Sequence, residues 1–194
     1  MENPLHNLDR YRIILASGSP RRRELLSMLG IDFEVIPSPL RDESYPDTLR
    51  PDQIAEYLAR AKAQVCDFGE NALTVCADTT VVCGSAVLGK PADKAQAWEM
   101  LTMLSGCTHE VITGVAVKCG DDLRSLSAST RVSFATLTPE EIEWYIDRYR
   151  PYDKAGAYGI QEWIGCIGVT GIEGSYYNVM GLPLHRLYTL LKSL

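Results

Sequence analysis

A strand-like segment, a tight break and a helix-like segment follow one another near the start of the chain. Residues 11–17 read YRIILAS, an apolar run typical of a buried strand. Gly18-Ser19-Pro20 interrupts this run, and residues 21–29 then carry leucines at helical spacing, with Gly30 well placed to end the helix. Strand–helix alternation of this kind indicates an α/β fold.

Similar patterns continue along the chain. Further strands are expected at residues 31–36, 73–83, 111–117 and 125–135, the last two as an antiparallel hairpin around the turn at 119–122. Further helices are expected at residues 52–68, 92–104, 139–149 and 183–191, while residues 37–51 should be loop and residues 156–174 irregular with a short strand. Thr138 and Glu141 form a capping box around Pro139. A hairpin inside strand–helix alternation predicts a mixed sheet.

Length and charge restrict the class of protein. With 194 residues and no visible linker, the sequence predicts a single domain over residues 1–194, with residues 1–10 as a flexible N-terminal extension. A net charge of −6 argues against a protein that coats nucleic acid. No apolar run approaches the roughly 20 residues that span a bilayer, and the N-terminus lacks a secretory h-region. We therefore expect a cytoplasmic protein with neither nucleic acid nor a membrane as its partner.

The cysteines and histidines do not form a familiar catalytic or metal-binding pattern. None of the 6 cysteines has CxxC spacing, so they are expected to be small buried hydrophobes rather than zinc ligands or a disulfide framework. With only 3 histidines, a His-rich metal site is hard to build. None of these histidines has a nucleophile-elbow context either.

The break after the first strand has the features of a phosphate-binding loop. Ser19 suits an N-cap, Pro20 suits the first helical position, and the free N–H groups of a helix start attract anions. Arg21–Arg23 follow at once, although cations near a helix N-terminus oppose the helix dipole. A bound phosphate would resolve that conflict. The alternative is a solvated basic turn, and the loop is not a Walker A motif.

Asp78 interrupts the apolar strand expected at residues 73–83. A buried carboxylate is unfavourable unless it holds a metal, a cation or a catalytic water, although a strand-end aspartate that caps a turn is the alternative.

Other charged residues could act with Asp78 or lie on the surface. Lys90, in the tight turn Gly89-Lys90-Pro91, could reach a phosphate. Asp42 or Glu43 could supply a second carboxylate, and the small neighbours of Lys62 would let it point inward from a closely packed helix. Carboxylates of this kind could hold Mg²⁺ or Mn²⁺ and take a proton from a water that attacks phosphorus.

Four segments together resemble the Maf family of nucleoside triphosphate pyrophosphatases. They are LASGSPRRRELLSMLG at 15–30, ADTTVV at 77–82 with GKP at 89–91, LSGCTHEVITGVAV at 104–117, and DKAGAYGIQ at 153–161 followed by GSYYNVMGLPL at 174–184. The resemblance implies an α/β fold in which an elongated mixed β-sheet is flanked by helices and two lobes surround a central cleft, as in inosine triphosphatases. It also implies a hydrolase that, with a divalent cation, converts a nucleoside triphosphate to the monophosphate and pyrophosphate.

The resemblance further implies roles for individual residues. Asp78 matches the proton acceptor, and Glu43 with Asp78 would bind the metal. The phosphate-binding positions are Ser17, Arg21, Arg22, Lys62 and Lys90. The positions that distinguish subgroups are Arg21, Thr79 and Gln161, which are typical of the dTTP/UTP subgroup, whereas the 7-methyl-GTP subgroup would have Trp, Gln and Glu.

The residue at 161 has a physical rationale. A Gln amide offers both donors and an acceptor, which suits the O4/N3–H edge of uracil or thymine, whereas a Glu carboxylate would suit a positively charged methylguanine. Where many relatives continue with Gly, this chain has Glu162 and Trp163, which add charge and bulk beside the expected base pocket. Trp163 could be a core residue or a stacking platform.

The sequence therefore predicts a metal-dependent pyrophosphatase that acts on dTTP and UTP, and on modified pyrimidine nucleotides as a further option, with a house-cleaning role. A 7-methyl-GTP pyrophosphatase and a nucleotide-binding regulator of cell division with little turnover are the alternatives. Nucleic-acid binding through Arg21–Arg23 and Arg60 is disfavoured by the acidic net charge. The family resemblance is also compatible with a homodimer.

Overall fold

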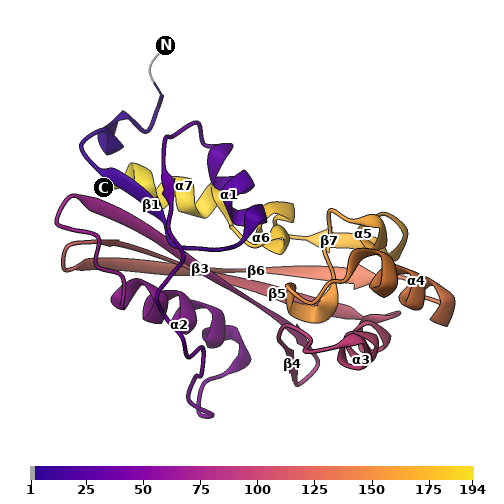
Figure 1. Cartoon of the computed structure of the whole chain (residues 1–194). Helices are drawn as coiled ribbons and strands as arrows, with labels where there is room; N and C mark the ends of the chain where they lie inside the picture. The colour runs from indigo at the N-terminus through magenta and orange to yellow at the C-terminus, as the bar shows by residue number, and fades with distance from the viewer. Residues whose placement is uncertain (1–2) are drawn as a thin grey trace. The chain divides into compact units, whose positions relative to one another are not determined.

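A computed structural model describes residues 3–194 and contains a seven-stranded mixed sheet (Figure 1). The strands are β1 (Arg12–Leu15), β2 (Glu34–Val35), β3 (Ala72–Cys83), β4 (Ala86–Leu88), β5 (Thr108–Cys119), β6 (Asp122–Phe134) and β7 (Val169–Glu173). They are ordered β2-β1-β3-β5-β6-β7, and β4 pairs with β3. β1 runs parallel to β2 and β3, whereas the pairs β3–β4 and β6–β7 are antiparallel. The predicted α/β fold with a mixed sheet is confirmed.

The helices are α1 (Pro20–Ser27), α2 (Pro51–Gln64), α3 (Lys94–Leu104), α4 (Pro139–Tyr149), α5 (Trp163–Gly168), α6 (Tyr176–Met180) and α7 (Leu184–Lys192), with 3₁₀ helices η1 (His6–Leu8) and η2 (Ala155–Ala157). Most of the predicted helices begin and end close to the positions observed. The capping box of α4 is confirmed, because Glu141 N–H donates to Thr138 Oγ1 (3.2 Å) and Thr138 N–H donates to Glu141 Oε2 (2.7 Å). No helix within residues 3–194 is long and apolar enough to cross a membrane.

The chain forms two compact units. Unit 1 comprises the residues up to Asp78 together with 113–128 and 181–194, and unit 2 comprises 79–112 and 129–180. The boundaries fall inside strands β3, β5 and β6 as well as before the last helix. Because the chain passes between the units within regular strands, no linker is visible in the sequence.

Small residues allow helix α2 to pack closely within unit 1. Ala59 and Ala63 are fully buried, and a Cβ at Gly114 of β5 would lie 2.3 Å from the carbonyl oxygen of Ala55. Only glycine therefore fits where this strand meets the helix. The sequence left Lys62 open between an inward and a surface position, and the structure shows that it is buried, since only 7% of the residue is exposed. In Figure 1, α1 and α7 lie on one side of the strands of unit 1, and α2 lies on the other side.

The described N-terminal residues pack against other segments of unit 1. Leu5 and Leu8 are buried, the Asn3 amide donates to the carbonyl oxygen of Leu29 (3.1 Å), and the Asn7 amide donates to that of Leu191 (2.9 Å). This arrangement differs from the flexible extension expected for residues 1–10, because the apolar side chains are buried there. Residues 1 and 2 of that prediction lie outside the described residues.

Four features differ from the sequence-based expectations. The strand expected at residues 31–36 is reduced to the two exposed residues of β2, and the turn after β3 contains the additional strand β4. The segment expected to be irregular contains α5, whose sequence WIGCIG is too short and glycine-rich to show helical periodicity. Cys66 and Cys76 are buried as expected, but the prediction was wrong for the exposed Cys107 and Cys166; all the cysteines are free thiols.

A buried histidine lies among aromatic rings in unit 2. His109 Nε2 is hydrogen-bonded to the Tyr158 hydroxyl (2.8 Å), and the imidazole meets the Phe134 ring edge-on with a centroid distance of 5.1 Å. Burial lowers the pKa of His109 to about 4, because desolvation disfavours the imidazolium ion. The folded protein therefore holds this side chain neutral over most of the ordinary pH range.

This pKa shift predicts a specific loss of stability in acid. The pKa of unfolded His109 is about 6.5, above its folded value, so its contribution is fully present above about pH 6.5 and is lost as the pH falls towards 4. The free energy of unfolding should fall by up to about 1.4 kcal/mol per pH unit in this window on account of this group. Urea denaturation at several pH values should give a shallower dependence for His109→Gln.

The exposed His185→Gln variant is the matched control and should keep the wild-type slope. A wild-type slope in His109→Gln would show that the buried imidazole is not the group responsible.

Candidate functional site

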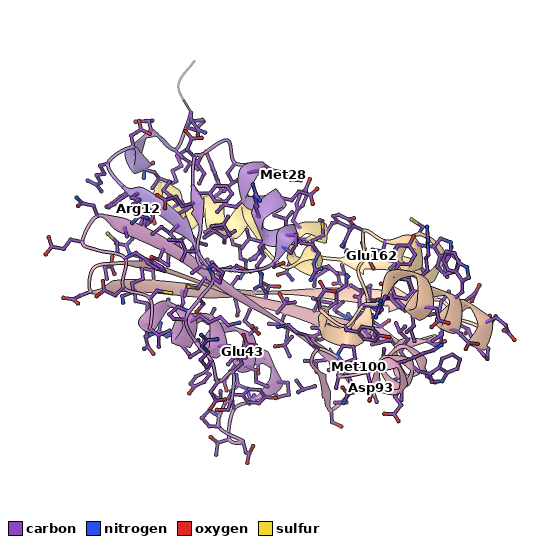
Figure 2. All side chains as sticks on the ribbon, viewed as in Figure 1. Arg12, Met28, Glu43, Asp93, Met100 and Glu162 are labelled. Atoms are coloured by element: carbon purple, nitrogen blue, oxygen red, sulfur yellow. The ribbon has the colours of Figure 1, made fainter. Side chains whose placement is uncertain are left out.

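An ammonium group joins two carboxylates in unit 1. Lys62 Nζ lies 2.6 Å from Asp78 Oδ1 and 2.8 Å from Glu43 Oε1. Lys62 comes from α2, Asp78 from within β3, and Glu43 from the irregular segment before α2, where it is labelled in Figure 2. Side-chain exposure is 12% for Asp78 and 44% for Glu43, so the ion pair has one buried acid and one that solvent reaches. Lys62 gives Asp78 the charged partner that a buried carboxylate needs.

The structure also decides which acid of the proline-rich loop joins this pair. Asp42 is exposed and accepts hydrogen bonds from the backbone N–H (2.9 Å) and hydroxyl (3.0 Å) of Ser44. Glu43 instead reaches Lys62. Adjacent acids on an irregular segment point in different directions, which is why the residue pattern alone left both open, whereas the family resemblance pointed to Glu43.

Arg22 of α1 is bound to the backbone beside Asp78. Its Nη1 donates to the carbonyl oxygen of Ala77 (2.8 Å) and its Nε donates to that of Gly181 (2.9 Å). Burial lowers the pKa of Arg22, and the negative charges of Asp78 and Glu43 oppose that shift. Arg22 therefore holds the strand at the residue before Asp78 and adds a second positive charge to the cluster.

The loop between β1 and α1 has the expected local geometry. Ser19 occupies the N-cap and Pro20 begins the helix, although the Ser19 side chain does not cap a helical N–H. Buried Ser17 accepts a hydrogen bond at Oγ from the Ser19 N–H (3.2 Å). The first turn of α1 contains no acidic residue and carries Arg21–Arg23. Positive charge and a helix start thus coincide, an arrangement that favours an anion.

Three of the predicted site residues belong to unit 2. Thr79 directly follows Asp78 in β3 and is half-buried, whereas Lys90 and Gln161 are exposed. Gly156 N–H donates to the carbonyl oxygen of Gly89 (3.0 Å), which ties the turn bearing Lys90 to the segment that leads to Gln161.

Sequence reasoning missed a second ionic cluster, which lies in unit 2. Lys154 is buried, and its Nζ lies 3.0 Å from Glu162 Oε1 and 2.8 Å from Asp153 Oδ1. The Tyr145 hydroxyl donates to Glu162 Oε2 and accepts from the Gly159 N–H (3.0 Å). Burial raises the pKa of the Tyr145 hydroxyl, and the Glu162 carboxylate raises it further. The signal in the sequence was the charged pair Asp153-Lys154 before an apolar segment that ends at Glu162.

The predicted metal ligands Glu43 and Asp78 fit a divalent cation in part. Mg²⁺ typically takes one or two protein carboxylates and completes its shell with water and substrate phosphates. These two carboxylates converge on Lys62, and each uses one oxygen in that ion pair. Within residues 3–194, no group of three or more His, Cys, Asp or Glu side chains is arranged to hold a metal. Metal binding here would therefore depend on oxygens from the substrate.

Comparisons with known proteins show to which family the chain belongs. Residues 12–194 match the family described as Maf-like protein. A dTTP/UTP pyrophosphatase of Phocaeicola vulgatus is 55% identical over 192 residues, which cover 98% of this chain and 100% of the relative. Another, of Porphyromonas gingivalis, is 51% identical over 192 residues, which cover 97% of this chain and 96% of the relative.

Among solved structures, a HAM1 protein from Coxiella burnetii superposes with a TM-score of 0.53 at 15% identity, over 95% of this chain and 100% of that protein. This likeness shows that the two proteins share a fold. The near-complete sequence matches are closer, and they establish that this chain belongs to the Maf family, as its sequence motifs predicted.

Proposed function

We propose that the protein is a pyrophosphatase that hydrolyses dTTP and UTP to the monophosphate and pyrophosphate. The names of relatives that are at least 50% identical over nearly their whole length support this substrate class. The observation that carries the mechanism is the buried Asp78 carboxylate, paired through Oδ1 with Lys62. This pair provides a fixed proton acceptor next to positive charge, which hydrolysis of a polyphosphate requires.

In the proposed mechanism, Asp78 accepts a proton from the water that attacks the α-phosphorus. Lys62 engages Oδ1, so Oδ2 is the atom that takes the proton. A bond forms between the water oxygen and the α-phosphorus, and the bond from that phosphorus to the bridging oxygen breaks. Pyrophosphate leaves with that oxygen. Lys62 also fixes the carboxylate, so that Asp78 need not reorient during the reaction.

Positive charge stabilises the phosphates in this proposal. Arg21, Lys62 and Lys90 would bind phosphate oxygens, Ser17 would donate a hydrogen bond, and Arg22 would add charge while it holds the Ala77 carbonyl. A divalent cation such as Mg²⁺ or Mn²⁺, held by Glu43 and Asp78, would neutralise developing negative charge on the phosphates. We propose that the positive side chains alone do not neutralise this charge sufficiently. Activity is therefore expected to require the metal.

The base would be read in unit 2. Gln161 is exposed at the end of an anchored segment, and its amide offers both a donor and an acceptor to a pyrimidine edge. Thr79 and Arg21 complete the positions that the family resemblance assigns to substrate preference.

We predict that Asp78→Asn reduces turnover by about 10²–10⁴-fold, because an amide cannot take up the proton from water. Nucleotide binding should persist, since the side chain keeps its shape. Pyrophosphate release should be measured from UTP, dTTP, CTP and 7-methyl-GTP with Mg²⁺, Mn²⁺ or EDTA, and binding by calorimetry. The exposed Asp52→Asn in the same unit is the matched control.

Wild-type turnover in Asp78→Asn would rule out the proton-acceptor role. Binding without any pyrophosphate release by the wild type would favour the regulator of cell division. Preferential release from 7-methyl-GTP would overturn the assigned substrate class.

We predict that Gln161→Glu lowers kcat/KM for UTP and dTTP by about tenfold or more, because a carboxylate removes the donor and places negative charge beside the O4 oxygen of the base. Metal dependence should stay as in the wild type. The measurement is a nucleotide panel at several metal concentrations, with the exposed Gln64→Glu as control. Identical relative rates across the panel would contradict a base-reading role for Gln161.

A further inference from the structure

The Glu162 carboxylate is held from two directions in unit 2. Tyr145 of α4 donates its hydroxyl hydrogen to Oε2, and Lys154 Nζ lies 3.0 Å from Oε1. Tyr145 is fully buried, and the side chains of Lys154 and Glu162 are 9% and 17% exposed. Because each oxygen has its own partner, the carboxylate has one orientation. Figure 2 labels Glu162 where the chain enters α5.

The same hydroxyl also fixes the turn that carries Gln161. Gly159 N–H donates to the Tyr145 oxygen (3.0 Å), and Glu162 N–H closes the turn on the Gly159 carbonyl oxygen (2.9 Å). Tyr145 thus binds the backbone at the start of the turn and the side chain at its end.

Gly159 brings the Gln161 amide and the Glu162 carboxylate to the same place. A Cβ at residue 159 would lie 2.8 Å from Glu162 Cδ, 2.9 Å from Glu162 Oε2 and 3.1 Å from Gln161 Nε2. Both side chains therefore lie over the space that a side chain at residue 159 would occupy. Glu162 Oε2 and Gln161 Nε2 are thus both close to this one point beside Gly159.

Helix capping does not explain this conformation of Glu162. The residue is the N-cap of α5, and its carbonyl oxygen accepts from the Gly165 N–H (2.9 Å). Its side chain makes no hydrogen bond to the helix and turns back to Tyr145 and Lys154 instead.

A glutamine amide alone cannot distinguish uracil from cytosine. Its oxygen and NH₂ group exchange places when the last side-chain bond rotates by half a turn, and uracil and cytosine present opposite donor and acceptor patterns at positions 3 and 4. Discrimination requires a neighbour that favours one orientation. A fixed carboxylate attracts the NH₂ group and repels the amide oxygen, so it supplies that preference.

We propose that Glu162 is a positioning residue that determines specificity, because it fixes the orientation of the Gln161 amide so that uracil and thymine are accepted and cytosine is rejected. The inference rests on the proposed function and extends it to a residue outside the reacting groups. Tyr145 and Lys154 support it by holding the carboxylate, and the reaction at phosphorus does not involve them.

The test compares UTP with CTP in Glu162→Gln, which keeps the shape of the side chain and removes its charge. We expect the ratio of kcat/KM for UTP to that for CTP to fall about tenfold, equivalent to about 1.4 kcal/mol of discrimination. The change should come from a lower KM for CTP and a higher KM for UTP, with kcat for UTP within about twofold of the wild type, because Asp78 and its partners are untouched.

Tyr145→Phe is the second variant and keeps the aromatic stacking on Tyr149. It should lower the same ratio by a smaller factor, and the double variant should fall no further than Glu162→Gln alone, because both changes act through one carboxylate. Glu143→Gln, at an exposed acid of α4 that pairs with Lys94, is the matched control and should leave the ratio unchanged. Thermal unfolding of each variant shows whether it is folded.

An unchanged ratio in Glu162→Gln would overturn the inference. Equal losses for UTP and CTP would also overturn it, because they would show a merely structural role. A wild type that hydrolyses neither nucleotide would refute the proposed function itself. If the wild type and the variants all hydrolyse UTP and discriminate equally well between UTP and CTP, only the role of Glu162 is refuted.

Discussion

The ammonium of Lys62 between Asp78 and Glu43 is the interaction on which unit 1 depends. The buried Ala59 and Ala63 together with Gly114 let α2 lie close to the sheet that carries Asp78. Loss of the Asp78 charge would leave the buried Lys62 ammonium with only the partly exposed Glu43 as its partner, which destabilises the fold. The group proposed to accept the proton is therefore also part of what holds α2 on its strands.

In unit 2, the segment that leads to Gln161 has little regular structure and is held in place in a different way. Its backbone and side chains are fixed one by one: Gly156 bonds to Gly89, Tyr158 to His109, and Gly159 to Tyr145. A segment without helix or strand ladders needs such individual partners when it is buried. The order of the proposed base-reading turn thus depends on specific polar side chains rather than on the sheet.

Local patterns in the sequence were sufficient for features that depend on neighbouring residues. The strand around Asp78 and the capping box of α4 were predicted correctly, because periodicity and capping are short-range properties, whereas the position of Lys62 was left open. Long-range contacts could not be read in the same way. The packing of Leu5, the choice of Glu43 over Asp42, and the meeting of Tyr145, Lys154 and Glu162 each depend on how distant segments fold together. The proposed roles of the site residues came from the family resemblance rather than from spacing.

The two clusters divide the proposed activity between different parts of the chain. Groups suited to proton transfer and charge stabilisation gather around Lys62, whereas Glu162 and its partners surround the residue proposed to read the base. A substitution near Glu162 changes the environment of Gln161 without removing any contact of Asp78, because no described contact of Glu162 involves the Lys62 cluster. If the proposed roles hold, substrate preference can change independently of the hydrolytic chemistry. On this physical basis, members of one family could keep the same reaction while they select different bases.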